Sequence, residues 1–67
     1  MIEIVLNGAP RRFETAPTVA GLLERERLLG KRVAVERNGA IVPKTLHAST
    51  AVADGDVVEI VVAVGGG

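Results

Sequence analysis

The sequence predicts one small α+β domain in which a single helix packs against a mixed sheet of four or five strands. Three observations support this fold class. Short segments rich in β-branched residues alternate with tight-turn signals, one segment has the apolar spacing of a helix, and no repeat interrupts the chain. Sixty-seven residues suffice for one domain only. We expect the folded domain over residues 1–63, followed by a mobile glycine tail at 64–67.

The first segment predicts a β-hairpin. Residues 2–6 are rich in β-branched side chains and alternate only roughly between apolar and polar, which is typical of a strand. Asn7-Gly8 follows and is a strong signal for a tight turn, because both residues tolerate positive φ. Residues 11–15 then form the returning strand. We expect this strand at the sheet edge, because Pro10 cannot donate a ladder hydrogen bond.

A short helix should follow the hairpin. Thr18 is a suitable N-cap, and Gly30 is well placed to end the helix in a left-handed conformation. Gly21 in the first turn lowers helix propensity, and Glu26 falls where the apolar stripe should continue. Either Glu26 turns to the surface, or the leucines that follow it fill the core. The stripe itself consists of Val19, Leu22 and Leu23.

The second half of the chain predicts another hairpin and a final strand. Asn38-Gly39 connects strands at 32–37 and 40–42, and an irregular stretch at 44–52 has room for a short helical turn. Residues 57–63 are the most apolar segment. Exposed, such a segment would invite aggregation, so we expect it in the middle of the sheet, parallel to the first strand. Its core-facing side chains are expected to be Val58, Ile60 and Val62.

The face of the sheet away from the helix should carry Val5, Val57 and Val61. Together these valines would form an apolar patch of the kind that marks a partner-docking surface. The alternative is that the stems of charged side chains partly cover them.

Composition excludes several function classes. Eight basic and eight acidic residues cancel, so no net field attracts nucleic acid or a membrane. The lone aromatic residue provides no platform for base stacking. Without cysteines, and with His47 as the one histidine, we expect no metal site and no bound cofactor. His47 is interpreted as a surface or loop-stabilising residue, and Asp54 and Asp56 as turn residues. No signal peptide is evident, which favours a cytoplasmic protein.

The reactive part of the sequence is its glycine tail, Val64-Gly65-Gly66-Gly67. Glycine loses more conformational freedom on ordering than any other residue, so we expect this tail to become ordered only on a partner. A thread without side chains can enter a narrow channel and present an unhindered carboxylate. That carboxylate can attack the α-phosphate of ATP, and sulfur or an amine can then displace AMP. We predict Gly67, next to Gly66, as the activated terminus, with Gly65 and Val64 as binding residues.

Three hypotheses remain open from the residues alone. The chain can be a carrier with an activated terminus, a modifier joined to lysines through Gly67, or an interaction domain whose glycine tail is only a frayed end. In the first two the chain is a protein co-substrate and not an enzyme. Deletion of Gly66 and Gly67 separates the third hypothesis from the others.

A family resemblance narrows these hypotheses. The segment Val33–Pro43, the turn Asp54–Asp56 and the strand that leads into the glycine tail resemble the ThiS family, the sulfur carrier proteins of thiamine biosynthesis. The similarity covers essentially the whole chain. Because ubiquitin and the small subunit of molybdopterin synthase share the diglycine end, molybdopterin synthesis and protein modification are the alternative functions.

The resemblance implies a β-grasp, ubiquitin-like fold and a pathway of sulfur transfer. A ThiF-like E1 enzyme would adenylate Gly67 with ATP and magnesium, and a donor such as a cysteine desulfurase would supply the sulfur. The resulting thiocarboxylate would give its sulfur to a ThiG-like thiazole synthase. The chain departs from the family pattern at Gly21 and at residues 26–29, which leaves the details of the helix open.

Overall fold

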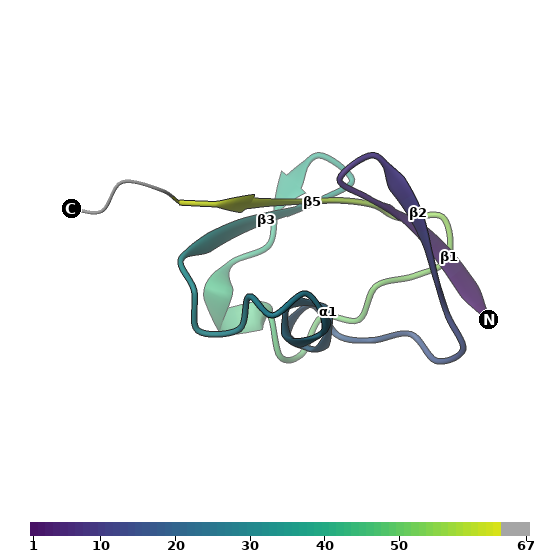
Figure 1. The fold of residues 1–67 in the computed structure, drawn as a ribbon, viewed down its shortest axis with the longest axis horizontal. Coiled ribbons are helices and arrows are strands. Elements are labelled where there is room, and N and C mark those ends of the chain that lie inside the picture. The colour runs from purple at the N-terminus through teal and green to yellow at the C-terminus, as the bar shows by residue number, and fades with distance from the viewer. Residues whose placement is uncertain (64–67) are drawn as a thin grey trace.

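The computed structural model of the protein describes residues 1–63, and the glycine tail expected at 64–67 lies outside them. A five-stranded sheet lies over one α-helix and a 3-10 helix (Figure 1). The elements are β1 (Ile2–Leu6), β2 (Ala9–Phe13), α1 (Val19–Arg25), β3 (Val33–Arg37), β4 (Ala40–Ile41), the 3-10 helix η1 (Lys44–Leu46) and β5 (Val57–Val62).

The sheet has the order β2-β1-β5-β3-β4, which confirms β5 as its central strand. β5 runs parallel to β1 and antiparallel to β3, as expected for a strand that returns after a crossover. β2 lies at one edge of the sheet, as expected. Pro10 has no N–H to donate, but at this edge the pairing of β2 with β1 does not need one from it.

Both Asn-Gly pairs form the tight turns that the sequence predicts. Asn7 and Gly8 have φ of 50° and 84°, and Asn38 and Gly39 have φ of 52° and 84°. Two consecutive residues with positive φ give the turn whose twist matches that of paired strands. These turns set the registers of the β1–β2 and β3–β4 hairpins.

The N-terminus of α1 is satisfied by one side chain and by the crossover segment. The Thr18 hydroxyl accepts a hydrogen bond from Gly21 N–H at 3.0 Å, which confirms the N-cap. The carbonyls of Thr50 and His47 accept from Val19 N–H and Ala20 N–H. These contacts hold the 44–52 segment against the first turn of the helix.

The prediction that Gly30 ends the helix is wrong. α1 ends at Arg25, and Arg27 takes the left-handed conformation with φ of 61°. Leu28 N–H donates to Leu23 O at 2.8 Å, and Arg27 N–H donates to Glu24 O at 3.0 Å. This is the Schellman arrangement, which brings the residue after the left-handed position back onto the helix. Leu28 thereby packs against the core, which offsets the strain of about 1–2 kcal/mol at a non-glycine residue.

The core lies between the sheet and α1. The predicted stripe of α1 is buried, as are Val58 and Ile60 of β5. Val62 points to the same side of β5 but is 41% exposed, because β5 runs past α1 toward the end of the molecule (Figure 1). The buried apolar residues are Ile4, Leu6, Phe13, Val19, Leu22, Leu23, Val35, Val42, Val52, Val58 and Ile60.

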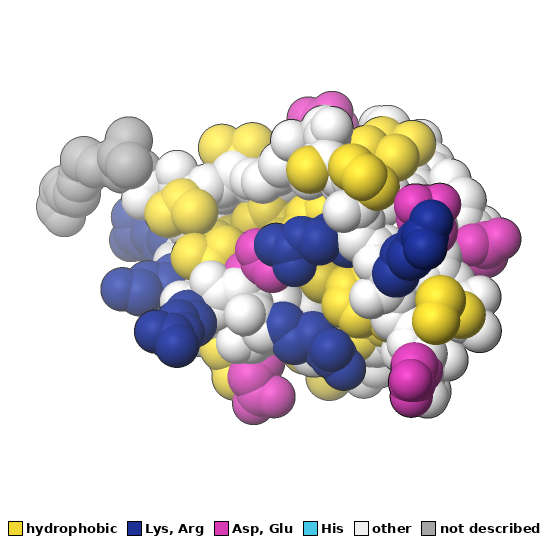
Figure 2. All heavy atoms as spheres, turned by 45° about the vertical axis from the view of Figure 1, so that its right-hand side comes forward, with side chains coloured by type: hydrophobic (Ala, Val, Ile, Leu, Met, Phe, Trp, Pro, Cys, Tyr) yellow, Lys and Arg dark blue, Asp and Glu magenta, His cyan; other side chains and the backbone are white. Residues whose placement is uncertain are grey.

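Charged side chains of both signs cover the surface, but not evenly. Figure 2 shows Lys and Arg side chains gathered at the end of the molecule where β5 ends, and Asp and Glu side chains more frequent toward the opposite end. Within residues 1–63, no helix has the length and apolar character needed to cross a membrane.

Candidate functional site

The candidate site is the end of β5, because this strand leads directly into residues 64–67. β5 is held on both sides, by β1 and by β3. Ala63 N–H donates to Arg32 O at 2.9 Å, so the pairing with the β3 side continues one residue past the strand. The predicted site residues Val64, Gly65, Gly66 and Gly67 lie beyond the part of the chain that the structure describes.

Asn7 extends the hold on β5 beyond the end of β1. The backbone register of β1 and β5 covers two residue pairs, Val5 with Val57 and Leu6 with Val58. Asn7 N–H then donates to Val58 O at 2.9 Å. Its side-chain amide continues the ladder, with Oδ1 accepting from Ile60 N–H at 2.8 Å and Nδ2 donating to Ile60 O at 3.3 Å. A turn residue therefore replaces the strand residue that β1 lacks.

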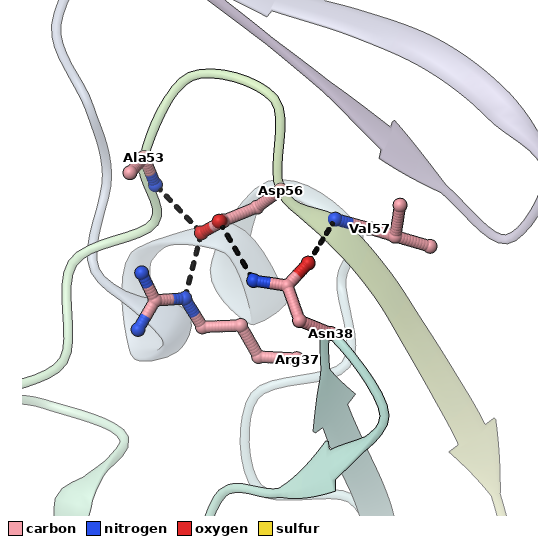
Figure 3. A network of polar contacts seen from close by, with 5 residues as sticks. All are labelled: Arg37, Asn38, Ala53, Asp56 and Val57. Atoms are coloured by element: carbon pink, nitrogen blue, oxygen red, sulfur yellow. Dashed lines mark hydrogen bonds and ion pairs between the residues drawn. The ribbon is translucent and has the colours of Figure 1, made fainter.

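Asn38, in the other Asn-Gly turn, holds the start of β5 from the opposite side. Its Oδ1 accepts from Val57 N–H at 2.8 Å, and its backbone N–H donates to Val57 O at 2.7 Å. Its Nδ2 donates to Asp56 Oδ1 at 3.0 Å (Figure 3). The two asparagines thus fix β5 from both neighbouring hairpins.

Asp56 is the buried charge at the start of β5. Its Oδ2 accepts from Arg37 Nε at 2.6 Å and from Ala53 N–H at 2.8 Å (Figure 3). Burial by itself raises the pKa of Asp56, but the hydrogen bonds from Asn38, Arg37 and Ala53 together outweigh burial. The pKa of Asp56 therefore lies below its usual value, and the carboxylate is ionised at neutral pH.

The predicted docking valines are all exposed on the face away from α1. Val5 and Val57 are 38% and 46% exposed and are cross-strand neighbours. Val61 is 58% exposed and lies two positions beyond Glu59 on the same face. Glu59 is itself paired with Glu36 across β3 and β5. The structure therefore brings two of the three valines together, and carboxylates interrupt the patch before the third.

The remaining polar residues have structural roles. His47 is buried, and its Nε2 lies 2.9 Å from Val42 O. Of the two predicted roles, a surface residue or a loop-stabilising residue, the structure supports the second. Asp56 Oδ2 accepts from Ala53 N–H three residues earlier, which confirms Asp56 as a turn residue. Asp54 lies in the same turn, but its Oδ1 accepts from Glu3 N–H and so ties the turn to β1. Among residues 1–63, no three His, Cys, Asp or Glu side chains converge to hold a metal ion.

Sequence reasoning missed the role of the two asparagines. It interpreted Asn7 and Asn38 as turn formers, which explains their positive φ but not their side-chain contacts. The usable signal was that both turns contain Asn-Gly, where Asp-Gly or Gly-Gly would also turn. An amide can donate and accept at once, which a carboxylate or a glycine cannot do.

The family of the chain follows from comparison with known sequences. The model of the ThiS family matches residues 4–67. The thiazole synthase of Paramagnetospirillum magneticum is 47% identical over 66 residues, which are 98% of this chain and 20% of that protein. This chain thus spans about a fifth of the length of that relative. The uncharacterized protein ycf40 of Pyropia yezoensis is 38% identical over 66 residues, with 98% of this chain and 93% of that protein covered.

A solved structure supports the same assignment. The crystal structure of the thiamine biosynthesis protein ThiS from Geobacter metallireducens superposes with a TM-score of 0.81 at 32% identity. The match covers 98% of this chain and all of that one. The expected β-grasp architecture, with its five-stranded mixed sheet and one α-helix, is therefore confirmed. On these matches of sequence and fold, the chain belongs to the ThiS family.

Proposed function

We propose that the chain is a sulfur carrier of thiamine biosynthesis, a protein co-substrate whose Gly67 carboxylate is converted to a thiocarboxylate. The observation that supports this most strongly is the ThiS family match, which extends over residues 4–67 and so includes the glycine tail. The same match favours thiamine biosynthesis over molybdopterin synthesis and protein modification.

The chemistry proceeds in two displacement steps. A carboxylate oxygen of Gly67 attacks the α-phosphate of ATP, pyrophosphate leaves, and an acyl-adenylate forms. A thiol reductant cleaves the S–S bond of the donor's persulfide, which leaves a disulfide and releases hydrosulfide. Hydrosulfide then attacks the acyl carbon and AMP leaves, so that one oxygen of the carboxylate is replaced by sulfur. Activation divides one difficult substitution into two easier ones. The proposal requires that Gly67 carry the free terminal carboxylate in the cell.

Partner enzymes supply the catalytic groups. A ThiF-like E1 enzyme would bind ATP and magnesium and adenylate the terminus, and a donor such as a cysteine desulfurase would deliver sulfur. The acceptor enzyme would be a ThiG-like thiazole synthase. This last assignment is supported by two relatives named thiazole synthase, which contain a region 47% and 36% identical to this chain.

The described residues would position the tail for these partners. Hydrogen bonds from Asn7 and Asn38 and the pairing with β3 hold β5 firmly. The neighbouring valines, Val5 and Val57, provide an exposed apolar contact for docking, and Val61 lies nearer the tail. A rigid strand that ends in a glycine thread lets a partner bind the domain and the terminus together.

The test uses the full chain and a variant that lacks Gly66 and Gly67. Both are incubated with the activating enzyme, ATP, magnesium and the sulfur source, and their intact masses are measured. We expect the full chain to gain the mass of one oxygen-to-sulfur exchange and the variant to remain unchanged with the same melting temperature. Growth without thiamine should depend on the full chain.

Two results would reject this function. A full chain that never exchanges oxygen for sulfur is not a carrier, and a shortened chain that still supports growth has no need of its glycine tail. Isopeptide-linked conjugates through Gly67 in cell lysates would instead identify a protein modifier.

A further inference from the structure

A groove of about 540 Å³ opens at the same end of the molecule as the end of β5. Its walls come from α1, the turn that follows α1, the start of β3, the η1 region and the end of β5. The volume falls within the range of about 300–1,000 Å³ that is typical of ligand sites. Leu29 lines it and is 57% exposed, so apolar surface remains uncovered there.

The charge of the groove is of one sign. Of residues 1–63, Lys31, Arg32 and Lys44 line it, and no Asp or Glu does. All three side chains are exposed, and none forms an ion pair within residues 1–63. By contrast, Arg11, Arg12 and Arg37 each pair with a carboxylate. Figure 2 shows basic side chains gathered at this end of the molecule. A chain with no net charge therefore presents a local cationic site.

One wall of the groove is an incomplete strand edge. Ala63 N–H donates to Arg32 O, so by the alternation of an antiparallel ladder Val33 points its N–H and C=O away from β5. β4 pairs with β3 only at Glu36 and Arg37, and Val42 N–H adds one bond to Val35 O. Among the described residues, nothing continues this pairing as far as Val33. Such an edge accepts an extended peptide.

We propose that this groove binds an extended segment of the thiazole synthase in which an apolar side chain lies next to acidic ones. The inference rests on the proposed function, which supplies the partner, and deepens it by naming the surface and the chemistry of its ligand. Charge complementarity selects an acidic segment. The apolar wall favours a ligand with an apolar side chain next to its acidic ones. The free N–H and C=O of Val33 favour an extended peptide backbone, which a membrane or a small anion does not offer.

The location fits this partner. Two relatives carry this domain within a chain named thiazole synthase, so in them the two parts are tethered to one another. A tethered domain gains effective concentration from the link. Affinity beyond what such a link supplies comes from surface contacts, and this groove lies at the end of β5.

The experiment measures binding of the unmodified full chain to the thiazole synthase, so it does not depend on thiocarboxylate formation. Lys44→Glu should weaken binding about fivefold at low salt, and the loss should shrink as salt rises. Leu29→Ser should weaken it about tenfold. The matched controls are Arg12→Glu, which makes the same charge change on β2, and Leu46→Ser, which alters another exposed leucine. Both controls should bind within about twofold of the parent chain.

Each other outcome overturns the inference. Unchanged synthase affinity in both groove variants rejects the groove, and so does an equal loss in the controls. A loss confined to the activating enzyme, or to vesicles of anionic phospholipid, assigns the groove to another ligand. The intact-mass assay keeps the two proposals apart, because groove variants should still form the thiocarboxylate normally. If the parent chain itself forms none, the proposed function fails.

Discussion

Replacing Asp56 with asparagine tests whether the buried carboxylate anchors β5. The carboxylate accepts three hydrogen bonds, at 2.6 Å from Arg37, 2.8 Å from Ala53 and 3.0 Å from Asn38. Hydrogen bonds to charged groups contribute about 1.5–3 kcal/mol each. An asparagine oxygen can keep two of them without the charge, but its NH₂ group would face the Nδ2 of Asn38, and two donors cannot bond.

The expected loss is therefore about 3 kcal/mol, from one charge-assisted bond removed and two weakened. In a domain of this size that lowers the melting temperature by about 12–24 °C. Asp54→Asn is the matched control. Asp54 is exposed and accepts one hydrogen bond, from Glu3 N–H, which an amide oxygen can also accept. It should change the free energy of unfolding by less than about 0.5 kcal/mol.

The pH dependence gives a second measure of the same residue. Because folding lowers the pKa of Asp56, the ionised form stabilises the fold above the usual Asp pKa of about 3.9. That stability disappears as the pH falls through the lower pKa of the folded state. The free energy of unfolding in urea should therefore differ between the parent chain and the Asp56→Asn variant. This difference should be large at about pH 7 and smaller at about pH 3. Equal stability at neutral pH, or a gap that widens in acid, would refute this reasoning.

Two further substitutions test the turn and the helix. Asn7→Gly keeps the positive φ but removes the side-chain amide that bonds to Ile60, so the free energy of unfolding in urea should fall by about 1–2 kcal/mol. Asn7→Asp keeps the acceptor for Ile60 N–H, so its free energy of unfolding should fall by less. Equal losses in the two variants would show that the turn, and not the amide, matters. Gly21→Ala should raise the melting temperature, with a gain of about 0.5–1 kcal/mol, since its Cβ would meet Thr18 Oγ1 at 3.4 Å, an ordinary contact. A lower melting temperature would indicate that the first turn of α1 is too crowded.

Local signals predicted most of the fold because they act over a few residues. The Asn-Gly pairs, the Thr18 cap and the apolar run at the end of the chain all have the predicted structure. The helix end was predicted wrongly because glycine often ends a helix, which pointed to Gly30. In the structure the helix ends earlier, at Arg25, and Leu28 turns back to pack against the core. Packing prevailed, and the cost was left-handed backbone at Arg27.

The sequence by itself determined the order of the elements, the central place of β5 and, through its resemblance to the ThiS family, the proposal that Gly67 reacts. Turn chemistry and apolar periodicity are local properties, so they can be inferred without coordinates. Only the tertiary structure decided that Asn7 and Asn38 hold β5 from both sides. It also decided that an apolar groove near the end of β5 carries three cations that form no ion pair within residues 1–63. These features join residues far apart in the chain, and no local pattern encodes which of them meet.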